Sequence, residues 1–181
     1  MRLFIAVKFS SEIENTLIKA QNDIRSHGVT GNYTNCSNLH LTLAFIGEYD
    51  SPDKVLNAMK LISFKAFLLS LSGKAGAFGD LWWAGLDKSS QLFSLDSQLR
   101  KALSDNGIPF DKKPFKPHIT LLRRAELPYG KDFDIKACKL PKASMKVDKL
   151  SLMLSHRENG RLIYTELGYV SAADEMRKGD V

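Results

Sequence analysis

The sequence has 181 residues, of which 44% are hydrophobic and 25% are charged, so it can form one domain with a real core or two small, closely packed lobes. No apolar run approaches the length of a membrane span, and Cys36 and Cys138 have no metal-ligand spacing, which favours a reduced cytoplasmic protein. The net charge of +6 and the pI of about 9.3 fit a polyanionic partner such as RNA without requiring one.

The first part of the chain alternates strand-like and helix-like patterns. In chain order we expect a strand at residues 2–9, a helix from 11 to 28, an irregular polar stretch at 29–38, a strand at 39–46 and a helix that starts at 51. Ser11 and Glu14 form a capping box for the first helix, and Gly28 suits its end. The first apolar run is too short for a secretion signal.

The second part continues with strands and one long helix. We expect strands at 67–73 and 81–86, a helix at about 91–105 that ends before Gly107, a strand after the basic segment 110–117, and two final strands joined by a turn at 158–160. No linker interrupts the pattern, so residues 1–170 are predicted to form a single bilobal domain. Residues 171–181 lack apolar periodicity and are predicted to form a flexible tail.

The chain contains an internal repeat. With one extra residue in the second copy, Ala6 aligns with Ala84, Ser11 with Ser90, Gly28 with Gly107 and His40 with His118. The motif HLTL at 40–43 then matches HITL at 118–121. Duplicated units often pack about a pseudo-two-fold axis. We therefore expect the two His-x-Thr strands to face each other across a central groove.

The paired motifs indicate a chemistry. Because alternate residues of a strand point to the same face, His40 and Thr42 share one face, as do His118 and Thr120, and the apolar faces are left for the helices. A neutral histidine can take a proton from water, a protonated one can give a proton to a leaving oxygen, and hydroxyls can hold phosphate oxygens. This set suits metal-independent phosphoryl transfer, whereas zinc would need ligands that neither motif provides.

Further candidates surround the second motif. Strict alternation would put Arg124 on the face of His118, but a bulge would bring in Arg123. Lys116 belongs to a basic segment that either approaches the groove or is a solvated loop. The aromatic side chains that suit stacking on an RNA base, or packing in the core, are Phe4, Tyr33 and Phe115.

These stretches together resemble a known family. The segments MRLFIAV, NLHLTLAFIGE, FKPHITLLRR and LSLMLSHRENGRLIYTELG follow one another over nearly the whole chain, and they are similar to those of the 2H phosphoesterases. The similarity is greatest to the RNA 2′,3′-cyclic phosphodiesterases, also called 2′-5′ RNA ligases. The resemblance implies an α+β fold of two antiparallel sheets that form a V-shaped groove, with the helices outside.

The resemblance also implies an activity and roles for single residues. It implies opening of a 2′,3′-cyclic phosphate at an RNA end to a 2′-phosphate, with reversible 2′-5′ ligation and without a metal or other cofactor. Separately, we expect the protein to be a monomer. His40 would be the general acid, His118 the general base, and Thr42, Thr120 and Arg123 would hold the phosphate. Tyr33 stands where the family has a tryptophan. The alternatives are a phosphodiesterase for small cyclic nucleotides or ADP-ribose 1″,2″-cyclic phosphate, and a non-catalytic RNA-binding module.

Overall fold

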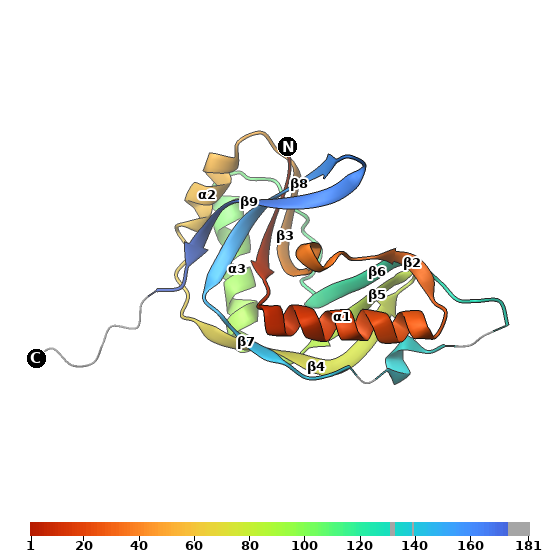
Figure 1. Ribbon diagram of the computed structural model, residues 1–181. Helices are drawn as coiled ribbons and strands as arrows, with labels where there is room; N and C mark the ends of the chain where they lie inside the picture. The colour runs from red at the N-terminus through yellow and green to blue at the C-terminus, as the bar shows by residue number, and fades with distance from the viewer. Residues whose placement is uncertain (131–132, 139, 174–181) are drawn as a thin grey trace, which may run out of the picture.

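The protein consists of two antiparallel sheets and three helices (Figure 1). A computed structural model describes residues 1–130, 133–138 and 140–173. The helices are α1 (Ser11–Ser26), α2 (Pro52–Met59) and α3 (Ser90–Asp105), with short 3₁₀ turns η1 (Cys36–Asn38) and η2 (Ile135–Ala137). The strands are β1 (Arg2–Lys8), β2 (Thr30–Tyr33), β3 (His40–Glu48), β4 (Phe67–Phe78), β5 (Leu81–Leu86), β6 (His118–Glu126), β7 (Ser144–Val147), β8 (Lys149–Glu158) and β9 (Arg161–Ser171).

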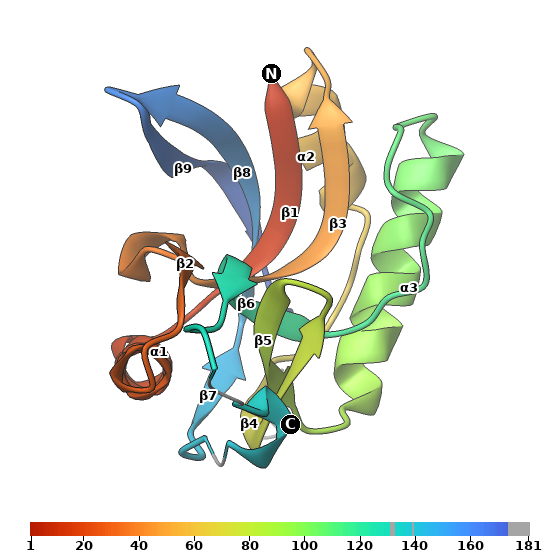
Figure 2. The same cartoon turned by 90° about the vertical axis from the view of Figure 1, so that its right-hand side faces the viewer.

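The two sheets form the two arms of the molecule. The first has the strand order β3-β1-β8-β9, and the second has the order β2-β6-β5-β4-β7. Figures 1 and 2 show the sheets opening from a common base, with the helices on their outer sides. The predicted α+β fold of two antiparallel sheets with the helices on the outside is therefore confirmed. None of the helices in the described part of the chain is long and apolar enough to span a membrane.

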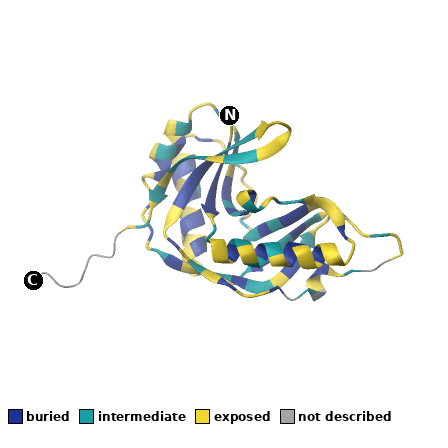
Figure 3. Cartoon of the chain, in the orientation of Figure 1, coloured by how far each residue is buried: buried dark blue, intermediate teal, exposed yellow. Residues whose placement is uncertain are grey.

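Each long helix packs on the sheet of the other arm. Although α1 follows β1 of the first sheet, its apolar face packs in one core with the second sheet, through Ile13, Leu17, Ala20 and Ile24 against Leu71, Ala84, Ile119 and Leu121. The helix α3 follows β5 of the second sheet and packs on the first, through Leu92, Leu95, Leu99 and Leu103 against Leu3, Ile5, Val7 and Leu41. Figure 3 shows buried residues along both sheets and an exposed β8–β9 hairpin tip. The exchange of helices ties the two arms together.

The repeat holds for the helices, but its alignment is shifted in the strands. Both α1 and α3 have 16 residues, and Gly28 and Gly107 follow them with positive φ angles of 80° and 63°. In the sheets, however, Ala6 pairs with Thr42, whereas Trp83 pairs with Thr120. The structural equivalent of Ala6 is thus Trp83 and not Ala84, because the second copy has two extra residues, not one, between its strand and its helix.

Three local predictions differ from the structure. The N-cap of α1 is Ser10, whose hydroxyl accepts from the backbone N–H of Ile13, so Ser11 is the first helical residue. Part of the polar stretch predicted to be irregular forms β2, an edge strand that pairs with β6. The end of the chain forms three strands where two were predicted, because Asp148 separates β7 from β8. At Asp148 the chain passes from the second sheet to the first. Most of the predicted tail, residues 174–181, lies outside the described residues.

Candidate active site

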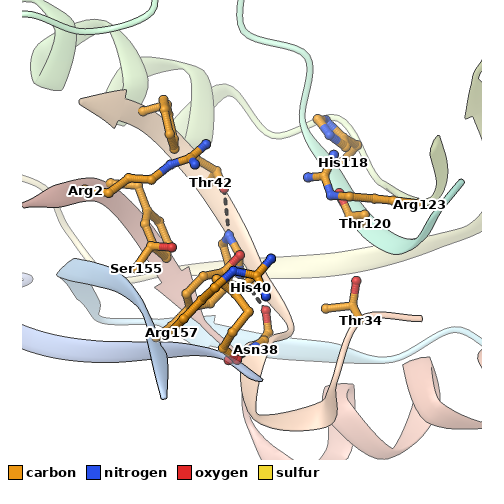
Figure 4. A pocket seen from close by; sticks show the side chains of 14 residues that line it. Arg2, Thr34, Asn38, His40, Thr42, His118, Thr120, Arg123, Ser155 and Arg157 are labelled. Atoms are coloured by element: carbon orange, nitrogen blue, oxygen red, sulfur yellow. Dashed lines mark hydrogen bonds between the residues drawn. The ribbon is translucent and has the colours of Figure 1, made fainter. Parts of the chain in front are cut away.

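A cavity of about 480 Å³ lies between the two sheets (Figure 4). Its lining residues come from β1, β3, β6, β8, β9 and the connection before β3: Arg2, Phe4, Thr34, Asn38, His40, Thr42, Phe45, His118, Thr120, Arg123, Ser155, Arg157, Leu162 and Tyr164. Figure 4 shows His40 and Thr42 on one side of the cavity and His118, Thr120 and Arg123 on the other. The structure thus brings both His-x-Thr motifs into one pocket.

The strands β3 and β6 each have a bulge directly after the His-x-Thr motif. The two bulges determine which later side chains of each strand point into the pocket. Relative to its partner strand, β3 has one extra residue after Thr42, and β6 has one extra residue after Thr120. Two consecutive side chains in each strand are therefore buried, namely Leu43 with Ala44 and Leu121 with Leu122. After each bulge the next side chain points back to the pocket, and these side chains are Phe45 and Arg123.

Strict alternation along β6 would have selected Arg124, which does not line the pocket. Besides the bulge after Thr120, β6 has a second irregularity where it pairs with β2, between Arg123 and Glu126. Arg124 has a positive φ of 52° there, and Gly31 of β2 packs closely on the backbone, since a Cβ at Gly31 would lie 2.8 Å from the Arg124 carbonyl oxygen. The arginine preferred from the family motif, Arg123, is the one beside the histidines.

His40 is held by hydrogen bonds at both ring nitrogens. Its Nδ1–H donates to the carbonyl oxygen of Asn38 at 2.7 Å, which leaves Nε2 2.8 Å from the Thr42 hydroxyl. The side-chain amide of Asn38 in turn donates to the Leu162 carbonyl on β9. The ring also contacts Phe4 and Tyr164, with ring centroids 4.9 and 5.2 Å away. These contacts fix the tautomer and the orientation of the imidazole.

His118 is oriented in the same way but lies in a more open setting. Its Nδ1–H donates to the carbonyl oxygen of Lys116 at 2.7 Å, so that Nε2 is the nitrogen left for the pocket. Its ring packs nearly at a right angle to that of Phe78, with the ring centroids 5.2 Å apart, and Phe78 is 44% exposed. The hydroxyl of Thr120 forms no hydrogen bond with the described residues, and it is therefore free to donate to a ligand.

The local charges act on the proton affinity of His40. Burial lowers the pKa of His40, the hydrogen bond to Asn38 opposes this effect, and the positive charges of Arg123 and His118 lower the pKa further. Burial raises the pKa of the Tyr164 phenol, with Arg123 and Arg2 opposing the shift, so the phenol stays neutral at physiological pH. In the ligand-free protein a neutral His40 is therefore favoured.

Three of the remaining predicted contacts lie outside the pocket. Tyr33 packs against the core of the second sheet, its hydroxyl donates to the Val29 carbonyl, and Arg25 lies over its ring at 3.9 Å. Phe115 packs edge-on against Phe93, and the Lys116 ammonium lies 6.0 Å from the centre of the Phe78 ring. Phe4 does line the pocket, but it is only 3% exposed, so little of its ring is available to stack on a base.

Several lining residues had no signal in the sequence that distinguished them. Arg2 and Arg157 look like ordinary charges at the ends of strands, and Tyr164 looks like one of several aromatic residues in a hairpin. Arg157 and Tyr164 reach the pocket because β8 and β9 extend the sheet that carries His40, and Arg2 reaches it from β1, the strand between β3 and β8. The alternation along β8 puts Ser155 and Arg157 on one face, but only the pairing of β1 with β8 shows that this face is the one beside His40.

The sequence is similar to a known family and to individual members of it. The sequence model of the 2′-5′ RNA ligase superfamily matches residues 11–159. The RNA 2′,3′-cyclic phosphodiesterase of Escherichia coli K12 is 31% identical over 177 residues, which cover 92% of this chain and 93% of that protein. The enzyme of the same name from Thermotoga maritima is 27% identical over 86% of this chain and 87% of its own length.

The fold is also similar to that of solved structures. The crystal structure of E. coli LigT complexed with 3′-AMP matches with a TM-score of 0.77 and 28% sequence identity, and the match covers 96% of this chain and 98% of that one. The structure of TT0787 of Thermus thermophilus matches with a TM-score of 0.74 and 27% identity, over 94% of this chain and 97% of that one.

Proposed function

The chain belongs to the 2′-5′ RNA ligase superfamily, and we propose that it opens 2′,3′-cyclic phosphates at RNA ends, leaving a 2′-phosphate. The observation that carries the proposal is the convergence of two oriented histidines, two threonines and Arg123 on one pocket from two different sheets. Relatives that align over most of the chain carry the name of this activity, which favours an RNA end over a small cyclic nucleotide.

In the proposed mechanism one histidine acts as a general base and the other as a general acid. One neutral imidazole takes a proton from water as its oxygen attacks phosphorus, and the bond between phosphorus and O3′ breaks. The protonated imidazole on the opposite side gives its proton to O3′. Proton exchange with solvent then restores both histidines. Because attack and departure occur in line, the two groups must lie on opposite sides of phosphorus, and the positions of His40 and His118 on opposite sides of the pocket support this arrangement (Figure 4).

Thr42, Thr120 and Arg123 hold the phosphate during this step. A guanidinium can donate two parallel hydrogen bonds to the non-bridging oxygens, whose charge is spread in the transition state. Thr120 has a free hydroxyl for the same purpose. The Thr42 hydroxyl lies 2.8 Å from Nε2 of His40, so the substrate must take over that hydroxyl or share it.

We assign the acid to His40 and the base to His118. The acid role requires a proton on His40, whose pKa is lowered in the free protein by burial and by the neighbouring Arg123. A bound phosphate carries a negative charge into the same space and offsets the charge of Arg123, so binding raises the pKa of His40 and loads the proton.

The activity is tested by incubating the protein, in EDTA, with a short RNA that ends in a 2′,3′-cyclic phosphate and mapping the product phosphate. A 2′-phosphate supports the proposal, and no opening of the ring contradicts it. Equal or faster opening of small cyclic nucleotides or ADP-ribose 1″,2″-cyclic phosphate would instead support the alternative substrate class. Adding RNA with a 5′-hydroxyl tests ligation, because a 5′-oxygen that attacks phosphorus in place of water, with loss of O3′, forms a 2′-5′ bond.

The assignment of acid and base has a separate test. Sulfur in place of O3′ leaves without protonation, so a 3′-thio cyclic phosphate needs the base but not the acid. With this substrate His40→Ala should approach the wild-type rate, whereas His118→Ala should stay slow. Recovery of His118→Ala in place of His40→Ala would reverse the two roles.

A further inference from the structure

The pocket carries more positive charge than a cyclic phosphate needs. Three arginines line it, Arg2, Arg123 and Arg157, and no carboxylate stands among its described lining residues. Within the described part of the chain none of the three forms an ion pair, whereas Arg100 is paired with Asp96. Three uncompensated guanidinium groups around one cavity raise the local concentration of anions.

The charge of the reacting group accounts for only part of this excess. A cyclic phosphate diester has one negative charge, and Arg123 with a protonated histidine already compensates it. Figure 4 shows Arg123 on the His118 side of the cavity, with Arg2 and Arg157 on the side of His40. Arg2 and Arg157 therefore form a separate pair of cations without an assigned anion.

These two arginines belong to one continuous face. In the antiparallel pair of β1 and β8, Arg2 lies directly opposite Ser155, and Arg157 follows Ser155 by two residues, so all three side chains project from the same side of the sheet. The face also carries Leu162 of β9, which pairs with Arg157 of β8. The hydroxyl of Ser155 adds a neutral donor between the two charges.

Neighbouring groups hold both guanidiniums in place. The guanidinium carbon of Arg2 lies 5.1 Å from the centre of the Phe45 ring, a cation–π distance. One terminal nitrogen of Arg157 donates to the Gly160 carbonyl at 2.9 Å, which leaves its other N–H groups for a ligand. A pre-oriented arginine loses less side-chain entropy when it binds an anion.

We propose that Arg2 and Arg157, with the Ser155 hydroxyl, form a second phosphate subsite that binds the phosphodiester on the 5′ side of the terminal nucleotide. This inference rests on the proposed function, because it takes the cyclic phosphate to lie between the histidines. The subsite would make the protein bind RNA chains more tightly than single nucleotides, since a mononucleoside cyclic phosphate has no phosphate at this position.

The test is a double-mutant cycle that removes a charge from the protein, from the ligand, or from both. Binding affinity is measured, so that the result does not depend on turnover. The ligands are a dinucleotide with a terminal 2′-phosphate and the same dinucleotide with a neutral methylphosphonate linkage. The proteins are the wild type, Arg2→Gln, Arg157→Gln and, as a matched control, Arg161→Gln, an exposed arginine of the same hairpin outside the pocket. Thermal unfolding confirms that each variant is folded.

The wild type should bind the phosphodiester about tenfold or more tightly than the methylphosphonate, as expected for a charged hydrogen bond. Arg2→Gln and Arg157→Gln should each remove most of that factor, and Arg161→Gln should keep it. The subsite is wrong if both variants weaken the two ligands equally, if the wild type does not distinguish them, or if it binds neither. A retained factor in a protein that opens no cyclic phosphate would leave the subsite standing and overturn the proposed function alone.

Discussion

The half of the pocket that carries His40 and the half that carries His118 share one backbone frame and differ in their side chains. Each has a His-x-Thr strand with Nδ1 bonded to the carbonyl two residues before, followed by a bulge. The side chain that the bulge returns to the pocket is Phe45 in one half and Arg123 in the other. The shared backbone thus places the two His-x-Thr motifs symmetrically. The side chain after the bulge differs, and Arg123 makes the His118 half the one suited to bind a negative charge.

The surroundings of the two rings differ as well. His40 lies against Phe4 and Tyr164, and the β8–β9 hairpin backs it with further lining residues. His118 has the exposed Phe78 beside it and the free Thr120 hydroxyl two residues on. A symmetric fold can therefore run an asymmetric reaction, because acid and base must differ in proton affinity at the moment of transfer.

The largest expected effect comes from breaking the symmetric pair itself. His40→Ala and His118→Ala should each lower the hydrolysis rate by about 10²–10⁴-fold, the usual contribution of general acid or base catalysis. The double variant should be little worse than either single one, because the two act as a unit. Rates on an RNA-terminal cyclic phosphate measure this.

His156→Ala is the matched control, since His156 is bonded to Thr165 on the β8–β9 hairpin and does not line the pocket. It should keep the wild-type rate. Near-full activity in either single variant of the pocket histidines would mean that the two-histidine mechanism is wrong.

The next effect concerns the exchange of helices between the halves. Leu17 of α1 and Leu95 of α3 are both fully buried, each against the sheet of the other arm. Leu17→Ala and Leu95→Ala should each lower the free energy of unfolding by about 2–5 kcal/mol. Because the arms share their helices, the fluorescence of Trp82 and Trp83 in the second sheet should shift with far-ultraviolet circular dichroism in both variants. Two separate transitions would show that the arms unfold independently.

A smaller effect should follow from the difference between Phe45 and Arg123. Arg123→Gln should lower kcat/KM by about ten- to a hundredfold, the range for a hydrogen bond to a charged group. It should also raise the pKa of His40 in the free protein, because it removes a positive charge that disfavours the imidazolium. Titration of the His40 ring by NMR measures this shift. An unchanged or lowered pKa would contradict the electrostatic coupling across the pocket.

The sequence predicts the elements that occur in both copies of the repeat. It does not predict features that depend on which strands pair in the sheets. The His-x-Thr strands, the long helices and the glycines after them were identified because each has a local signature that also recurs. The edge strand β2 was missed because it is polar and largely exposed, so its pairing with β6 leaves no apolar pattern. Ala6 was aligned with Ala84 because composition does not report which face of a strand a small residue occupies.

The pocket was predicted in its motif residues and missed elsewhere for a similar reason. Arg2 and Arg157 lie 155 positions apart in the chain and meet only through the pairing of β1 with β8. Tyr33 was a reasonable base-stacking candidate by position, but its ring is occupied by Arg25 and the core of the second sheet. The alternation rule selected Arg124 because it assumes an unbroken strand, but the bulge after Thr120 shifts the alternation and puts Arg123 on the pocket side.

The smallest effect separates the two copies of the repeat at the start of their helices. Ser10 and Ser89 are the N-caps of α1 and α3, and their hydroxyls lie 3.5 and 3.2 Å from the N–H groups they accept from. Ser10→Ala and Ser89→Ala should each cost about 1 kcal/mol of stability, with the larger loss at Ser89 because its hydrogen bond is shorter. Urea unfolding measures both. Ser11→Ala is the control, since Ser11 lies inside the helix, and a loss there equal to that at Ser10 would restore Ser11 as the cap that the sequence suggested.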